Sequence, residues 1–287
     1  MIRHIFKLVI ILGLIICFVF IKTNNFFVKK EISGVSTTTT TAPNKELIIE
    51  TDKTNEKPVN KEKYYAPVLA YHHIAPRQSQ NSYYVSPVIF DQQLTWLEDN
   101  DYTVISMDKF YEAASNDGTL PEKPIVLTFD DGNPDNYTNA FPILKKHNMT
   151  GTFFIKLNNI QNEGKGMTWD KLKEMSDAGM TIGSHTINHD NLTNLDDQSL
   201  YREVAESKNI IEKHLGITIK YFSYPGGAYS DKVIFELKDA GYLMAFTSKH
   251  KVYQQITDDN SFYKIPRVHI DDEMPSFIDW IQGINLY

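Results

Sequence analysis

Short apolar runs alternate with amphipathic stretches from residue 64 to the end of the chain. The runs are rich in β-branched and aromatic residues, which is typical of buried strands. They lie at 67–71, 102–105, 125–129, 150–155, 181–184, 219–224, 243–247 and 265–270. Between the first two runs, Phe90, Leu94 and Leu97 have the spacing of one helix face. Strands that alternate with helices predict an α/β fold with a largely parallel sheet.

Helical spacing fills most of the other gaps between the runs. The predicted helices lie at 107–114, 139–147, 169–178, 198–215 and 231–240. Gly179 directly follows the third of these, as a glycine that ends a helix does. No internal repeat is apparent, and this disfavours a solenoid.

The first 21 residues form a separate segment, because residues 5–21 are almost wholly apolar. At about 1.5 Å per residue, roughly 17 residues give a helix near the lower limit for crossing a bilayer. We therefore expect a signal anchor, a transmembrane helix that makes this a single-pass protein of the cell membrane. Arg3 and Lys7, on the N-terminal side of the span, favour an extracellular position for the rest of the chain, although lysines just beyond the span reduce the charge difference.

Two other fates stay open for this segment. Cleavage as a signal peptide would give a secreted protein, but no clear small-x-small cleavage site follows Ile21. Lipid attachment at Cys17 is disfavoured, because isoleucines precede it where small residues would be expected. Residues 22–63 are mostly polar and predict a disordered linker. The folded domain is therefore expected at 64–287.

Charge and cysteine content narrow the classes of function. The formal net charge is −7, and no basic cluster with interleaved aromatic residues occurs in the domain, so we expect no nucleic-acid partner. Cys17, in the apolar segment, is the only cysteine, so no disulfide can form within the domain.

Two acids follow the strand predicted at 125–129, in the sequence TFDDG at 128–132. Successive side chains of an extended segment point in different directions, so one of Asp130 and Asp131 can bind a metal while the other stays free. A free carboxylate beside a metal can act as a general base. Alone, however, Asp-Asp-Gly would be interpreted as an ordinary turn.

His185 and His189 follow the strand predicted at 181–184. Their spacing would bring both rings to one side of a helical turn. Two imidazoles and one carboxylate suit zinc, and three protein ligands leave a position for water. Since Pro225 and His269 also follow strand ends, where parallel α/β enzymes place their chemistry, we expect one shared site.

These motifs resemble those of the polysaccharide deacetylase family, the carbohydrate esterases of family 4 with a NodB-homology domain. The resemblance covers roughly residues 64–287 and implies a distorted (β/α) barrel. It implies that Asp130 is the catalytic base and that Asp131, His185 and His189 are the metal ligands.

The later motifs of the family match less completely. Its commonest third motif has an arginine two residues before a proline and an aromatic residue after it, where this chain has Ser223 and Gly226. The resemblance still implies a substrate groove at Tyr224 and Pro225, with the Gly226 N–H as an oxyanion donor. Arg267 is a candidate replacement for the missing arginine. Val268-His269 resembles the last motif and implies His269 as the general acid.

The segments PVLAYHHI at 67–74 and FSYPGG at 222–227 look most like the branch that deacetylates poly-N-acetylglucosamine. The resemblance implies a metal-dependent N-deacetylase that releases acetate from an acetylated hexosamine polysaccharide, most closely extracellular poly-β-1,6-N-acetylglucosamine. Zinc is the expected cofactor, with cobalt or nickel as alternatives. Peptidoglycan is the alternative substrate, and a non-catalytic anchored glycan-binding module is the alternative class. A glycosidase that uses Asp130 and Asp131 is disfavoured. Its two acids must flank the scissile bond at about 5 Å or more, and adjacent residues are poorly placed for this.

Overall fold

The computed structural model describes residues 66–76, 81–116, 118–161, 166–250, 256 and 258–284. The predicted membrane helix at 1–21 and the predicted linker at 22–63 lie outside these residues. Among the helices that the structure does describe, none has both the length and the apolar character to span a bilayer.

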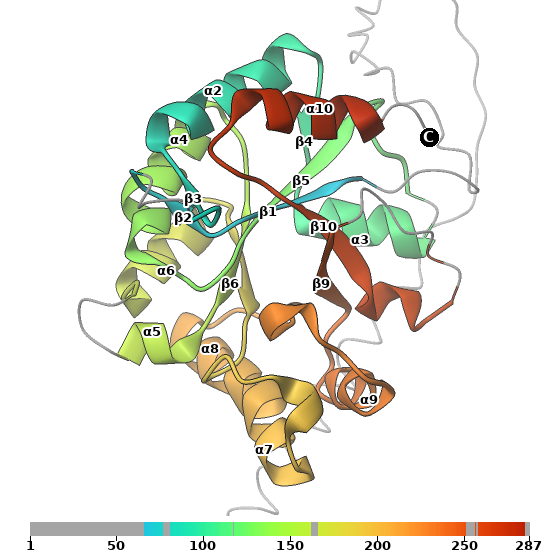
Figure 1. The fold of residues 1–287 in the computed structure, drawn as a ribbon. Coiled ribbons are helices and arrows are strands. Elements are labelled where there is room, and N and C mark those ends of the chain that lie inside the picture. The colour runs from blue at the N-terminus through green and yellow to red at the C-terminus, as the bar shows by residue number, and fades with distance from the viewer. Residues whose placement is uncertain are drawn as a thin grey trace, which may run out of the picture. The chain divides into compact units, whose positions relative to one another are not determined.

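Parallel strands of the described residues close into a seven-stranded barrel (Figure 1). The order around the barrel is β1, β10, β9, β8, β7, β6 and β5, which pairs again with β1. Their bounds are β1 Val68–Tyr71, β5 Pro124–Phe129, β6 Thr152–Ile155, β7 Thr181–Ser184, β8 Tyr221–Ser223, β9 Met244–His250 and β10 Ile265–His269. An additional strand, β4 (Thr103–Val104), pairs with the beginning of β5. The barrel confirms the prediction of a parallel α/β fold.

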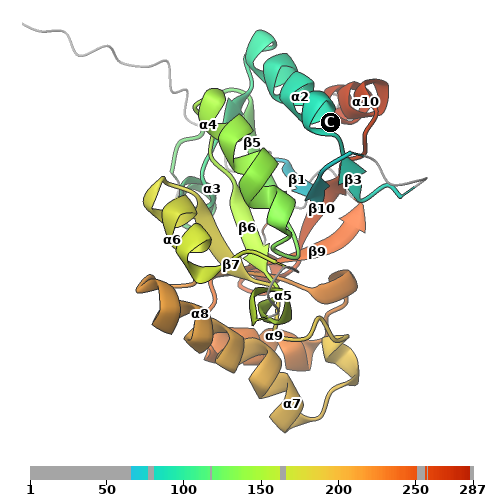
Figure 2. The ribbon, with the colours of Figure 1, turned by 90° about the vertical axis from the view of Figure 1, so that its left-hand side faces the viewer.

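Helices lie outside the ring of strands (Figures 1 and 2). They are α2 Pro87–Asp99, α3 Met107–Asn116, α4 Phe141–Lys146, α5 Leu157–Gln161, α6 Trp169–Asp177, α7 Asp197–Tyr201, α8 Ser207–Leu215, α9 Asp231–Asp239 and α10 Met274–Ile284. In α2, the Ser86 side chain accepts a hydrogen bond from the Ile89 N–H and caps the helix. Its predicted face of Phe90, Leu94 and Leu97 is fully buried.

The structure differs from the predicted elements in a few places. A single π-helical turn, η1 (Asn136–Ala140), precedes α4. A second one, η3 (Arg202–Glu206), interrupts the helix predicted at 198–215. The sequence did not predict α5, α10 or the ribbon of β2 (His73–Ile74) and β3 (Tyr84–Val85). Two-residue strands are too short to show a period, and these two form because the fold brings residues 73 and 84 together.

Alternation along the strands separates two hydrophobic clusters. In β5, Ile125, Leu127 and Phe129 belong to the cluster under the helices, whereas Val126 belongs to the cluster inside the barrel. The next inward position, Thr128, is polar and buried, and Asp130 follows it at the strand end. The interior of the barrel therefore changes from apolar to polar toward the C-terminal ends of its strands.

Gly183 in β7 allows close packing inside the barrel. A Cβ atom there would lie 2.5 Å from Phe154 Cδ1 and 2.8 Å from the Tyr221 carbonyl oxygen. We expect Gly183→Ala to lower the free energy of unfolding by about 1–3 kcal/mol, because the backbone oxygen cannot move without disturbing β8. Urea unfolding followed by circular dichroism measures the loss.

Gly283→Ala is the matched control for this substitution. No atom lies within 4 Å of a Cβ placed at Gly283, near the end of α10. The control should be neutral or stabilising by up to about 1 kcal/mol. Equal losses in both variants would contradict the packing argument.

Candidate active site

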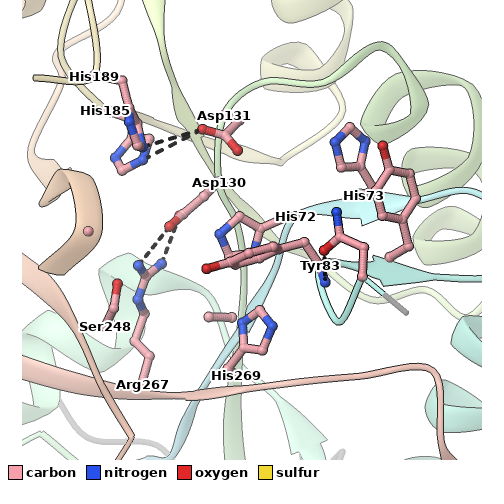
Figure 3. Close-up of a pocket in the computed structure, with 14 residues that line it drawn as sticks. His72, His73, Tyr83, Asp130, Asp131, His185, His189, Ser248, Arg267 and His269 are labelled. Carbon is pink, nitrogen blue, oxygen red and sulfur yellow. Dashed lines mark hydrogen bonds and ion pairs between the residues drawn. The ribbon is translucent and has the colours of Figure 1, made fainter. Parts of the chain in front are cut away.

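A cavity of about 460 Å³ opens where the C-terminal ends of β1, β5, β7 and β10 meet (Figure 3). Its lining includes the predicted residues Asp130, Asp131, His185, His189 and His269. These residues come from three separate segments of the chain, and the barrel brings them to one place, as the sequence predicted.

Asp131, His185 and His189 form a compact set of potential metal ligands. One ligand atom from each lies within 4.8 Å of the others. Asp131 Oδ1 is 3.8 Å from His185 Nε2 and 3.7 Å from His189 Nε2. A tetrahedral zinc ion with ligands at about 2.0–2.1 Å separates them by roughly 3.3 Å, so small side-chain movements would complete the set.

A hydrogen bond shows which ring nitrogen of His185 is available to bind a metal. Its Nδ1 lies 2.7 Å from the Ser223 carbonyl oxygen, which can only accept, so Nδ1 carries the hydrogen. Nε2 then keeps its lone pair and faces Asp131 and His189. A ligand histidine held in this way by a carbonyl group is the usual arrangement around a protein metal site. The donor set therefore fits a divalent ion such as zinc.

The prediction that His185 and His189 share a helical turn is wrong. Residues 185–189 form a loop in which Thr186 and His189 have φ values of 68° and 69°. The Thr186 hydroxyl accepts a hydrogen bond of 2.9 Å from the His189 N–H and helps to fix the loop. The rings converge, with centroids 4.8 Å apart, because the chain reverses between them.

Glu203, a buried acid in η3, accepts hydrogen bonds from this loop and fixes its position. Its Oε2 accepts hydrogen bonds from the Ile187 and Asn188 N–H groups at 2.9 and 2.8 Å, and its Oε1 accepts one from Asn188 Nδ2. A buried carboxylate that receives three donors is satisfied without a cation. The sequence did not single out Glu203, because nothing in its local pattern links residue 203 to residue 187.

Asp130 lies against Arg267 in the interior of the barrel, and each is only 2% exposed. The Arg267 guanidinium donates to both carboxylate oxygens, at 2.8 and 2.7 Å. It also donates to the Ser223 hydroxyl at 2.8 Å and to the Thr247 carbonyl oxygen at 3.2 Å. The structure thus places an arginine from β10 against Asp130.

The charge of Arg267 decides the protonation of Asp130. Burial opposes ionisation of the carboxyl group, but the Arg267 guanidinium outweighs it and holds the pKa of Asp130 well below its usual range. Asp130 is therefore a carboxylate throughout the neutral range. Asp131, with φ of 72°, turns the other way toward the histidines, so the two adjacent acids have different partners.

His269, His72 and Tyr83 form the wall opposite the potential metal ligands (Figure 3). The His269 ring lies 5.2 Å from that of His72 and 5.0 Å from that of Tyr83, in edge contacts. Its Nε2 lies 3.1 Å from the Ser82 carbonyl oxygen. Burial lowers the pKa of His72 to about 4, against the attraction of Asp130, so His72 is neutral at neutral pH.

Of the groove residues predicted at 224–226, one lines the cavity and two do not. Gly226 lines the cavity, but Pro225 is buried and is not part of the described lining. Tyr224 is fully buried and donates a hydrogen bond of 2.9 Å to the Tyr263 carbonyl oxygen. Its side chain therefore packs in the core and does not reach the groove, because it points to the same side of the chain as Phe222, opposite to Ser223, which faces Asp130.

The sequence did not predict some of the residues that line the cavity. Tyr83 and Ser248 lie at the cavity but belong to no recognisable motif. Tyr83 precedes the very short strand β3, and Ser248 lies in β9, whose sequence looks like an ordinary strand. Only their inward position in the folded chain distinguishes them from other surface residues.

Comparison with known proteins gives the class that this fold and cavity define. A family model described as polysaccharide deacetylase matches residues 117–245. The chain is 32% identical over 208 residues to YxkH of Bacillus subtilis, a protein named for the same family, and the match covers 72% of each chain. This chain belongs to the polysaccharide deacetylase family.

Other relatives are more distant but informative. The chain is 26% identical over 205 residues to the poly-β-1,6-N-acetyl-D-glucosamine N-deacetylase of Staphylococcus aureus, covering 67% of this chain and 69% of the relative. The solved structure of the Streptococcus pyogenes deacetylase PplD with acetate matches with a TM-score of 0.69 and 29% identity, over 74% of this chain and 96% of PplD. IcaB of Ammonifex degensii matches with a TM-score of 0.63 and 25% identity, over 76% and 96%.

Arg267→Gln should destabilise the metal-free domain, because it leaves the buried Asp130 carboxylate without its counter-charge. We expect a loss of about 3–5 kcal/mol at neutral pH. In the wild type the pKa of Asp130 is depressed, so the pair stabilises the fold above the unfolded pKa of about 3.9 and loses this effect only as pH falls through the folded pKa.

In the variant, burial without Arg267 raises the pKa of Asp130 above its unfolded value, so lowering the pH relieves the destabilisation. The difference in unfolding free energy between wild type and Arg267→Gln should therefore shrink from pH 7 to pH 4. Urea titrations with a chelator present measure it. A difference that stays constant over this range would contradict the assignment of the ion pair.

Glu203→Gln should weaken metal binding, since an amide cannot accept from all three donors of the His185–His189 loop. We expect about 10- to 100-fold lower affinity for zinc or cobalt by isothermal titration calorimetry. Glu206→Gln is the matched control, because Glu206 lies in the same π turn but is half-buried and only weakly paired with Arg202 at 4.0 Å. Equal effects of the two substitutions would show that Glu203 does not position the loop.

Proposed function

We propose that this protein hydrolyses N-acetyl groups of an extracellular polysaccharide that contains N-acetylglucosamine, with poly-β-1,6-N-acetylglucosamine as its substrate and a divalent metal, zinc first, as its cofactor. One observation carries the proposal. An ionised, buried carboxylate, Asp130, adjoins a set of three potential metal ligands in one cavity. A purely structural metal site would need no such free carboxylate.

Asp131, His185 and His189 would hold the ion. When bound, a zinc ion polarises an acetyl carbonyl group and lowers the pKa of water to about 7. The position of Asp130 suits it to take the proton from the attacking water. Arg267 would orient the Asp130 carboxylate and keep it ionised until that transfer. The Gly226 N–H, at the cavity rim, would donate to the oxygen on which negative charge develops.

The remaining proton transfer belongs to the leaving group. Water oxygen bonds to the acetyl carbon, the carbon–nitrogen bond of the amide breaks, and the nitrogen must gain a proton as it leaves. We assign this proton to His269, which lies on the opposite wall of the cavity from the metal ligands. Acetate and a free hexosamine amine are the products.

The choice of polysaccharide follows from the relatives. The Staphylococcus aureus relative is named for deacetylation of poly-β-1,6-N-acetyl-D-glucosamine. An extracellular substrate also suits the proposed N-terminal anchor, which would place the domain outside the cell membrane at the end of the linker. We propose this location together with the activity.

Acetate release from poly-β-1,6-N-acetylglucosamine oligomers tests the proposal, with peptidoglycan as the competing substrate and residues 1–21 removed. We expect release with added zinc or cobalt, its loss with a chelator, and a drop of about 10³-fold or more in kcat for Asp130→Asn, which loses general base catalysis. Metal-loaded protein that binds the oligomers but releases no acetate would instead indicate a glycan-binding module. Preferential release from peptidoglycan would replace the proposed substrate.

His269→Gln and His72→Gln compare the two histidines of the opposite wall. If His269 supplies the proton, its substitution should remove the basic limb of the pH–rate profile and lower kcat by about 10²- to 10⁴-fold. His72→Gln should keep that limb. The reverse pattern would transfer the role to His72.

A further inference from the structure

Tyr83 presents an aromatic ring at the mouth of the cavity. The side chain is 51% exposed although it is large and apolar. Its ring contacts His72 and His269 edge-on, with centroid distances of 4.5 and 5.0 Å, and Figure 3 shows the three rings grouped together. The ring is thus fixed at its edges by two neighbours, while much of its surface is left uncovered.

The backbone around Tyr83 is held before any ligand arrives. The His73 N–H donates to the Tyr83 carbonyl oxygen at 2.9 Å, and the Tyr83 N–H donates to Asn81 Oδ1 at 3.0 Å. On the other side of the ribbon, Tyr84 stacks on His73 at 4.2 Å, and His73 Nδ1 bonds Asp135 at 2.8 Å. Little conformational entropy therefore remains for Tyr83 to lose on binding.

Gly226, another residue of the cavity lining, offers no comparable ring. Gly226 is exposed there, and no atom lies within 4 Å of a Cβ placed on it. The aromatic residue that the family's third motif commonly has at this position is absent. Among the described lining residues, the tyrosines are those of the ribbon formed by β2 and β3, Tyr83 and Tyr84.

We propose that Tyr83 is a substrate-positioning residue, whose ring stacks on the pyranose that carries the reacting N-acetyl group. The inference rests on the proposed function, because it concerns the same site. A pyranose has an apolar face of C–H groups and a polar edge of hydroxyl groups. The apolar face can stack on the exposed Tyr83 ring, and the polar edge can contact the charged side chains that also line the cavity. Contact of Tyr83 with His269 places the sugar beside the group that protonates its nitrogen.

Stacking requires the aromatic ring of Tyr83 but not its hydroxyl group. A variant without the ring should therefore differ from one that lacks only the hydroxyl group. Tyr83→Ala should lower kcat/KM on poly-N-acetylglucosamine oligomers by about tenfold, mainly through KM, whereas Tyr83→Phe should stay close to wild type. Hydrolysis of p-nitrophenyl acetate, which has no sugar to stack, should fall much less in Tyr83→Ala than hydrolysis of the oligomers does. Tyr201→Ala is the control, because Tyr201 is similarly exposed at 48% but lies in α7 away from the cavity lining.

A merely structural role would produce different results. If Tyr83 only supports His269, Tyr83→Ala would shift the basic limb of the pH–rate profile and lower kcat with KM unchanged, and the inference would be overturned. Unchanged kcat/KM on oligomers, or equal losses for Tyr83→Ala and Tyr83→Phe, would overturn it as well.

Binding separates this inference from the proposed function. Oligomer titrations by calorimetry use metal-loaded Asp130→Asn, with and without Tyr83→Ala. About tenfold weaker binding in the double variant supports stacking even if the wild type releases no acetate, a result that would contradict only the proposed activity. Equal binding by the two proteins rejects stacking whatever the activity.

Discussion

The ion pair between Asp130 and Arg267 is the interaction on which the site depends. Both charges lie inside the barrel, where an unpaired charge would cost several kcal/mol. Arg267 satisfies its remaining donors on β5, β8 and β9, through Thr128, Ser223 and the Thr247 carbonyl oxygen. One guanidinium group therefore links four strands of the barrel, including its own, and fixes the carboxylate in their midst.

This pair also separates the two adjacent acids. Asp130 continues the inward alternation of β5, whereas Asp131 and Gly132 adopt positive φ values of 72° and 64° and turn the chain away. Asp131 consequently faces His185 and His189. The two adjacent acids thus have different partners, because β5 ends at Phe129 and the backbone turns at Asp131.

Support for the histidines comes from the end of β8 and from η3. The Ser223 carbonyl oxygen orients His185, and the Glu203 carboxylate holds the loop between His185 and His189. Ser223 thus contacts both halves of the site, with its hydroxyl group on Asp130 and Arg267 and its carbonyl group on His185. The position where the family commonly has an arginine is here a small residue that leaves room for an arginine from β10.

The sequence by itself determined the parallel α/β pattern and pointed to the acids and histidines of the potential metal site, because periodicity is local and these side chains follow strand ends directly. Only the tertiary structure decided how these residues are supported. Glu203 contacts Ile187 across 16 residues, Arg267 contacts Asp130 across 137, and His269 contacts Tyr83 across 186. Such contacts leave no local period or spacing. The burial of Tyr224 and the loop at 185–189 were likewise decided by packing, which overrides the spacing of neighbours along the chain.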